Sequence, residues 1–369
     1  MVTAIPAAAD DAPPALPSAI NGCVGPSPVR DGGQVSWPLA RMAPYQAWSL
    51  SRGKGVVVAI LDSGVSSAAV GLAGAVAAGK DVVTGGPAQS DCLGRGTALA
   101  AIVAARPTSG TGVVGMAPEA TVLPIRIINP QGKVTTKAIS DGVNAAVDAG
   151  ADIILLGTGD VTNAQALRDA VARAAGRNIL VVAPVNDGPS NLPGQPPPAW
   201  YPAAYPEVLA VGGVGPDGRA TTSTGAASEP DVLAPGVGAV VPGPTGPGQY
   251  SVGGTAIAAA YAAGAAALVR AYYPDLTAAE VTRRLLVTAE RPPHAVAGTI
   301  DPYAAVSMIE PDEATRTVHR DANPVSVALR PPADPAIARA RLVSIAVAVT
   351  TVLSAVLLWT WRARRARTR

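Results

Sequence analysis

The chain has few of the residues that bind metals, with two cysteines and two histidines among its 369 residues. Cys23 and Cys92 lie far apart, and His294 and His319 have no ligand-like spacing, so we expect neither a metal nor another cofactor. Charge is also scarce, and a net charge of +2 excludes the broad basic face of a nucleic-acid-binding protein. With 49% hydrophobic and 15% charged residues, the chain can instead bury a large core.

From residue 55 onward, short apolar runs alternate with helical patterns. This alternation predicts parallel βαβ units in one sheet that is covered on both faces. Thr277 and Glu280 form a capping-box pattern that opens one of the helices. The expected strands are residues 56–61, 121–128, 153–156, 179–183 and 208–214, and the expected helices are residues 136–149, 163–175, 256–269 and 277–289.

The longest apolar run, residues 342–361, carries no charge and has about the 20 residues that a helix needs to cross a bilayer. Trp359 and Trp361 stand at its end, and residues 362–369 contain five arginines. A buried core helix is the alternative, but the arginines favour one transmembrane helix with a cytoplasmic tail. We therefore expect the lipid bilayer as a partner and the preceding domain on the outer side of the membrane.

An exported domain can keep a disulfide, so we expect Cys23 and Cys92 to pair rather than to remain two unrelated thiols. The bond would tie residues 10–54, a proline-rich extended arm, to the loop before Arg95. Residues 1–9 are too short for a signal peptide but end like one, in three alanines before Asp10. We expect the true translation start to lie upstream, which N-terminal sequencing of the native protein would test.

Three segments have the form of strand ends and helix entrances around one cleft. Residues 59–65 are an apolar run that ends in Asp62-Ser-Gly, residues 94–100 begin Gly-Arg95-Gly-Thr, and residues 254–259 begin Gly-Thr-Ala256. Glycine permits close approach of backbones, and threonine can cap a helix. The three segments resemble the signature blocks of the subtilisin-like serine proteases (peptidase S8), whose triad runs Asp, His, Ser along the chain.

This resemblance implies an α/β subtilisin-like three-layer sandwich with a mainly parallel central sheet, and it places Asp62, Arg95 and Ala256 at the triad positions. The whole layout is similar to that of the mycosins, the membrane-anchored subtilases of type VII secretion systems. Its parts are an N-terminal extension (1–54), a subtilase-like domain (55–308), a proline-containing linker (309–341), a transmembrane helix (342–361) and a basic tail (362–369). The partners so implied are membrane components of a type VII secretion complex.

The triad positions carry residues that the family's mechanism does not use. Arg95 holds its proton at neutral pH and cannot act as a base, and Ala256 has no nucleophilic atom. The oxyanion position falls on Asn186 or Asp187, depending on a one-residue gap. We therefore predict a chain that is not an enzyme but a pseudoprotease scaffold, with an endopeptidase using unorthodox residues or a non-cleaving peptide-binding decoy as alternatives.

Asp62 needs a new partner where the family has histidine. Arg95 can supply one through a two-pronged ion pair, which we predict in place of the catalytic hydrogen bond. The alternative is an Arg95 side chain that points to solvent while backbone amides hold Asp62.

Overall fold

The structure is a computed structural model that describes residues 13–17, 22–29, 35–185, 198–221, 229–292, 295 and 297–309. The chain divides into two compact units, residues 1–316 and 317–369, and all described residues belong to the first. Several predicted features lie outside the described residues: both candidate oxyanion residues, Asn186 and Asp187, the two histidines and the apolar run 342–361.

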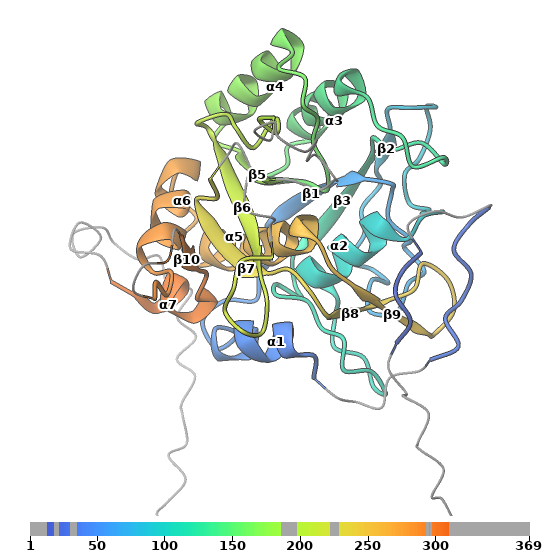
Figure 1. The fold of residues 1–369 in the computed structure, drawn as a ribbon, viewed down its shortest axis with the longest axis horizontal. Coiled ribbons are helices and arrows are strands. Elements are labelled where there is room, and N and C mark those ends of the chain that lie inside the picture. The colour runs from blue at the N-terminus through green and yellow to red at the C-terminus, as the bar shows by residue number, and fades with distance from the viewer. Residues whose placement is uncertain are drawn as a thin grey trace, which may run out of the picture. The chain divides into compact units, whose positions relative to one another are not determined.

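An eight-stranded sheet of parallel pairs forms the centre of the described unit, in the order β10-β7-β6-β5-β4-β1-β3-β2 (Figure 1). The five strands expected from the apolar runs are present and almost wholly buried, because helices cover both faces of the sheet. The strands are β1 (Val57–Asp62), β2 (Lys80–Asp81), β3 (Thr121–Arg126), β4 (Ile153–Leu156), β5 (Leu180–Pro184), β6 (Val208–Val214), β7 (Val232–Pro235) and β10 (Gly298–Thr299).

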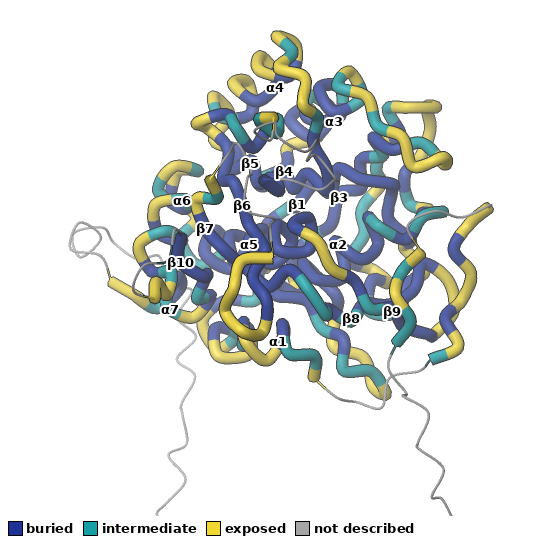
Figure 2. The backbone as a smooth tube through the Cα atoms, viewed as in Figure 1, coloured by how far each residue is buried: buried dark blue, intermediate teal, exposed yellow. Residues whose placement is uncertain are grey.

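Alternate residues of β1 enter two different cores, so the expected three-layer sandwich is confirmed. Val58 and Ile60 pack with α2 (Arg95–Ala104), α5 (Thr255–Tyr272) and α6 (Ala278–Val287). Ala59 and Leu61 pack with α3 (Thr136–Asp148) and α4 (Gln165–Gly176) on the other face. Figure 2 shows the central strands and α5 buried, whereas α3, α4 and α6 carry exposed residues. The predicted capping box of Thr277 and Glu280 opens α6.

The central helix α5 runs through the larger core and is built mostly of alanine. Gly264 shows why small residues are needed, because a Cβ on it would lie 2.5 Å from the Cβ of Met116. Within the described part of the chain, α5 is the one helix long and apolar enough to cross a membrane. Since 89% of this helix is buried inside the fold, its apolar side chains form part of the hydrophobic core.

The N-terminal extension is less extended than we predicted. Residues 35–54 include α1 (Trp37–Met42) and a 3-10 turn, η1 (Pro44–Gln46), where the proline content suggested an irregular arm. Pro38 stands at the start of α1, where its missing N–H costs nothing, and Met42 at its end is buried in the core. The prediction was wrong here because prolines at helix starts are compatible with short helices.

The predicted disulfide between Cys23 and Cys92 is present and fastens residues 22–29 to the loop before α2. Beside it, the backbone N–H of Val24 donates to the carbonyl of Cys92 over 2.8 Å. A separate two-stranded sheet, β8 (Ala239–Pro242) with β9 (Gln249–Val252), precedes α5. The N–H of Gln249 donates to the carbonyl of Val29, so the extension also lies along β9.

Replacing both cysteines by serine, Cys23→Ser with Cys92→Ser, is expected to lower the free energy of unfolding by about 2 kcal/mol. The bond joins residues 69 positions apart, so its loss increases the conformational entropy of the unfolded chain. The effect stays moderate because the bond fastens the N-terminal extension and not the main core. Urea denaturation of the protein measures the change. A reducing agent added to the unchanged protein should reproduce it, and equal stability with and without the bond would contradict the expectation.

Candidate functional site

The three motif segments meet at one cavity of about 220 Å³. Asp62 is the last residue of β1, Arg95 the first of α2 and Ala256 the second of α5, and all three line this cavity. Gly94 (φ 77°) and Gly254 (φ 118°) precede the two helices in conformations that residues with a side chain rarely adopt. The glycines of the motifs thus turn the chain so that both helices begin at the end of β1.

The predicted ion pair between Arg95 and Asp62 is present. Asp62 is fully buried, and Arg95 approaches it with Nε on Oδ1 and Nη2 on Oδ2, each at 3.4 Å. The backbone N–H of Ser63 also donates to Asp62 Oδ1, over 2.8 Å. The alternative of an Arg95 side chain turned to solvent is wrong, although 39% of that side chain remains accessible at the cavity.

Arg95 has a second partner that sequence reasoning missed. Its Nη2 donates to the carbonyl of Gly157 over 3.1 Å, just beyond the end of β4, the neighbour of β1. A Cβ on Gly157 would lie 2.0 Å from Asp62 Oδ2, so only glycine fits there. Gly157 opens a Gly-Thr-Gly run, residues 157–159, which was the available signal, but the contact of Gly157 with Arg95 depends on the register of two strands.

Apolar side chains make most of the cavity wall around the ion pair. The lining residues beyond the triad positions are Ala15, Leu16, Pro17, Ala98, Leu99, Ser251, Val252, Gly253 and Ile257. Among them, Ser251 carries a hydroxyl group, which is the one alcohol that this described wall offers. The arrangement suits an apolar side chain of an extended peptide, with the partly exposed guanidinium of Arg95 within reach.

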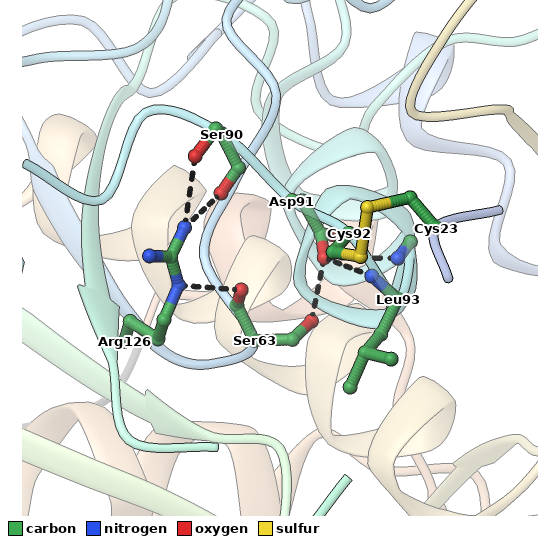
Figure 3. The surroundings of a disulfide bond; sticks show 8 residues. Cys23, Ser63, Ser90, Asp91, Cys92, Leu93 and Arg126 are labelled. Atoms are coloured by element: carbon green, nitrogen blue, oxygen red, sulfur yellow. Dashed lines mark hydrogen bonds between the residues drawn. A yellow bond between two sulfur atoms is a disulfide. The ribbon is translucent and has the colours of Figure 1, made fainter. Parts of the chain in front are cut away.

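A buried carboxylate, Asp91, holds the start of α2 in place (Figure 3). Its Oδ1 accepts from the hydroxyl of Ser63 at 2.9 Å and from the backbone N–H groups of Leu93 and Gly94 at 3.1 and 2.9 Å. Its Oδ2 accepts from both the N–H and the hydroxyl of Thr97, at 2.8 and 2.7 Å. One side chain therefore satisfies several donors at the entrance of the helix that carries Arg95.

The same network connects the disulfide to the end of β1. Cys92 follows Asp91 directly, and the hydroxyl of Ser63 accepts from the N–H of Gly96 over 3.0 Å. On the other side, Arg126 donates from Nε to the Ser63 carbonyl and from Nη2 to the Ser90 carbonyl (Figure 3). These contacts fix Asp62 and Arg95 relative to one another. We did not predict them, and the aspartate four residues before Arg95 was the signal that could have found them.

Burial raises the pKa of Asp91 above its ordinary value of 3.8, although hydrogen bonds from Thr97 and Ser63 act in the opposite direction. Because the folded pKa exceeds the unfolded one, the folded state binds the proton more tightly. The stabilisation from protonation is complete below pH 3.8 and is lost as the pH rises through the folded pKa.

An Asp91→Asn variant does not titrate at this position, so it tests the direction of that shift. The free energy of unfolding of the unchanged protein minus that of the variant is expected to fall as the pH rises from about 4, by at most about 1.4 kcal/mol per pH unit. Urea denaturation of both proteins across the same buffers measures this difference, in which the titrating groups that do not interact with Asp91 cancel. A difference that grows with pH would contradict the raised pKa.

Residues 53–319 match the model of the subtilase family, Peptidase S8. Subtilisin DY of Bacillus licheniformis is 35% identical over 252 residues, which cover 68% of this chain and 89% of the relative. Mycosin-1 of Mycobacterium tuberculosis is 30% identical over 381 residues, covering 83% of this chain and 84% of the relative.

Solved structures of the same family are also similar to this chain. A structure of MycP1, described as a serine protease and an essential component of the type VII (ESX-1) secretion system, superposes with a TM-score of 0.68 and 26% identity. It covers 82% of this chain and all of that chain. A structure of the MycP3 protease of the type VII (ESX-3) secretion system gives 0.66 and 27%, over 83% of this chain.

These relatives correct one prediction. We expected from Arg95 and Ala256 that the chain is not an enzyme, and the comparisons contradict this, because the matched family and its named members are serine proteases. The error was to infer the class of the protein from two side chains alone. The chemistry of those side chains is unchanged, so hydrolysis here has to draw its nucleophile and its base from other atoms than those of Ala256 and Arg95.

Proposed function

Since this chain belongs to the subtilase family, we propose that it is a mycosin-type component of a type VII secretion membrane complex. In this role its subtilase-like domain binds other components on the outer face of the membrane. The observation that carries the proposal is the similarity to Mycosin-1, which extends over 83% of the chain. That span is longer than the part matched by the general family model, residues 53–319.

The proposed location rests on two features of the chain. The uncharged residues 342–361, followed by the arginines of residues 362–369, would anchor the protein with its tail in the cytoplasm. Residues 309–341 would then link the anchor to the domain. The disulfide between Cys23 and Cys92 supports an oxidising compartment for the domain, because such bonds persist outside the cytoplasm.

Affinity purification of the tagged full-length protein from membranes in mild detergent tests the proposal. Mass spectrometry is expected to find type VII secretion membrane components in the eluate. A variant that ends after residue 341 should be released from the membrane and lose those components. Recovery of the full-length protein alone, from extracts in which a known mycosin retains its partners, would contradict the proposed role.

Peptide hydrolysis is a second candidate function, favoured by the serine proteases among the relatives. The hydroxyl of Ser251 lies in the wall of the cavity that also contains Asp62 and Arg95. A fluorophosphonate probe followed by peptide mapping identifies any reactive serine directly. Labelling of Ser251 that disappears in Ser251→Ala would support hydrolysis at this site, and labelling that survives in that variant would assign the reaction elsewhere.

A further inference from the structure

Large hydrophobic side chains are exposed together around α7 (Pro302–Ser307). Tyr303 lies on this helix and is 44% exposed, and Met308 and Ile309 follow it at 42% and 76%. The helix packs against η1 and α6, which expose Tyr45 and Val287. These five residues, the α7 patch, make up most of the large hydrophobic residues that the described part of the chain exposes, so the exposure is concentrated on one surface.

The α7 patch rests on a firmly held base. The guanidinium of Arg284 donates to the carbonyls of Ala305 and Met308. The hydroxyl of Tyr273 donates to the carbonyl of Val306 over 3.0 Å. The side chains of Ala305 and Val306 are themselves buried in the larger core. The exposed side chains are therefore held outward by the fold and do not result from a frayed helix end.

The charges near the α7 patch do not favour an electrostatic partner. Arg41 and Glu290 form an ion pair of 2.5 Å between the end of α1 and the segment after α6, so the two charges cancel. Along the chain, Glu310, Asp312 and Glu313 follow the patch directly. An anionic surface would repel these carboxylates, so a contact of the patch has to depend on its apolar side chains.

The chain leaves the described domain from within the α7 patch. Ile309 is the last described residue, and residues 310–341 separate it from the apolar run 342–361. If that run crosses the membrane, the patch is the surface of the domain that the shortest stretch of chain joins to the bilayer. Such a tether raises the local concentration to about the millimolar range, so a few apolar contacts suffice for binding.

The five side chains suit the boundary between lipid headgroups and acyl chains. Tyr45 and Tyr303 combine an apolar ring with a hydroxyl group, and tyrosine is enriched at that depth of a membrane. Val287, Met308 and Ile309 are wholly apolar. Apolar surfaces of this kind insert about 5–10 Å into the boundary, and their binding grows with the apolar area that they bury there.

We propose that the α7 patch is a second membrane contact of this protein, which inserts into the headgroup boundary of the bilayer that anchors residues 342–361. The inference rests on the proposed location of the domain at the membrane, but not on any secretion partner. The domain is then not only tethered by residues 310–341. The patch holds it against the bilayer in one orientation, with α7 and η1 on the lipid side.

Reconstitution of the full-length protein alone into phosphatidylcholine liposomes tests this contact. A nitrobenzoxadiazole label on Ser307→Cys reports from α7, one turn after Tyr303, and the same label on Lys137→Cys reports from α3 on the other face of the sheet. Spin-labelled phosphatidylcholine is expected to quench the label on Ser307→Cys at least about twofold more strongly than the label on Lys137→Cys. The difference should persist in about 0.5 M salt, because the contact is apolar.

Two exposed residues of the patch provide the variant that removes the contact. Tyr45→Glu with Ile309→Glu, introduced beside the label on Ser307→Cys, should lower the quenching to the level of Lys137→Cys, because carboxylates oppose insertion. Val161→Glu is the matched control and should leave the quenching unchanged. Val161 is a similarly exposed hydrophobic residue, at 48%, in the loop between β4 and α4 and outside the patch.

Flotation of the same liposomes distinguishes a failure of the patch from a failure of the anchor. Protein that does not float with the liposomes contradicts the membrane anchor and the patch contact together. Floating protein whose two labels are quenched equally overturns the patch contact alone. Quenching that the paired glutamates leave unaltered, or that salt abolishes, also overturns it, even if co-purification with secretion components succeeds.

Discussion

A double variant, Arg95→His with Ala256→Ser, is expected to hydrolyse a chromogenic peptide substrate at least about 100-fold faster than the unchanged chain, as kcat/KM. The reason lies in the buried carboxylate of Asp62, which is ready to orient an imidazole at position 95. A serine at the second position of α5 would lie in the same cavity, at a helix entrance whose N–H groups favour negative charge. The two substitutions would thus supply a base and a nucleophile together.

The single variants are the controls for this gain. Arg95→His without the serine, and Ala256→Ser without the histidine, should each give less than a tenth of the increase, because the two groups act as a unit. Adding Asp62→Ala to the double variant should remove most of the gain. A rate in the double variant no higher than in the unchanged chain would contradict the expectation and direct attention to another nucleophile, of which Ser251 is the described candidate.

Arg284→Ala is expected to lower the free energy of unfolding by about 4 kcal/mol. Arg284 is fully buried in α6 and donates to the carbonyls of Ala305 and Met308 and to the hydroxyl of Tyr273. Its guanidinium carbon also lies 4.3 Å from the centre of the Tyr273 ring. Alanine would leave a cavity and would remove this donor from the carbonyls of Ala305, which is buried, and Met308, at the end of α7 (Pro302–Ser307).

The neighbouring Arg283 offers a matched control, because it has the same side chain on the same helix but is exposed. Arg283→Ala should change the stability by no more than about 0.5 kcal/mol. Thermal and urea denaturation, followed by circular dichroism, measure both variants. A loss of similar size at the two positions would show that helix α6, and not the buried guanidinium, determines the effect.

The repeating apolar pattern was sufficient to predict five of the eight strands of the sheet and the helices α3, α4, α5 and α6, because strands buried on both faces are continuous apolar runs. The resemblance of the motif segments, and not the apolar pattern, placed Asp62 and Arg95 at neighbouring triad positions, and the need of a buried carboxylate for a cation then predicted the ion pair. Contacts that depend on the register of distant segments could not be predicted in the same way. Gly157 reaches Arg95 through the pairing of β4 with β1, which no local pattern specifies.

The N-terminal extension shows the same limit. Its prolines suggested an irregular arm, although Pro38 stands at the start of a helix in which Leu39 and Met42 are buried. The pairing of Ala15 with Ser251 joins segments that lie far apart in the sequence, and neither segment has a strand pattern long enough to predict it. Family membership was predictable because three motifs agreed in order, whereas enzymatic class could not be derived from two substituted positions.

The N-terminal residues 13–17, which contain three prolines and lie along β9, affect the solubility of the domain. An open strand edge carries unpaired N–H and carbonyl groups that can recruit strands from other molecules, which is a common start of aggregation. Here residues 13–17 cover that edge through the hydrogen bonds of Pro14 and Leu16 with Ser251. Of the residues 13, 15 and 17, which face away from β9, two are prolines and have no N–H to offer a further strand. The extension therefore covers the outer edge of the two-stranded sheet and protects the domain against edge-to-edge association.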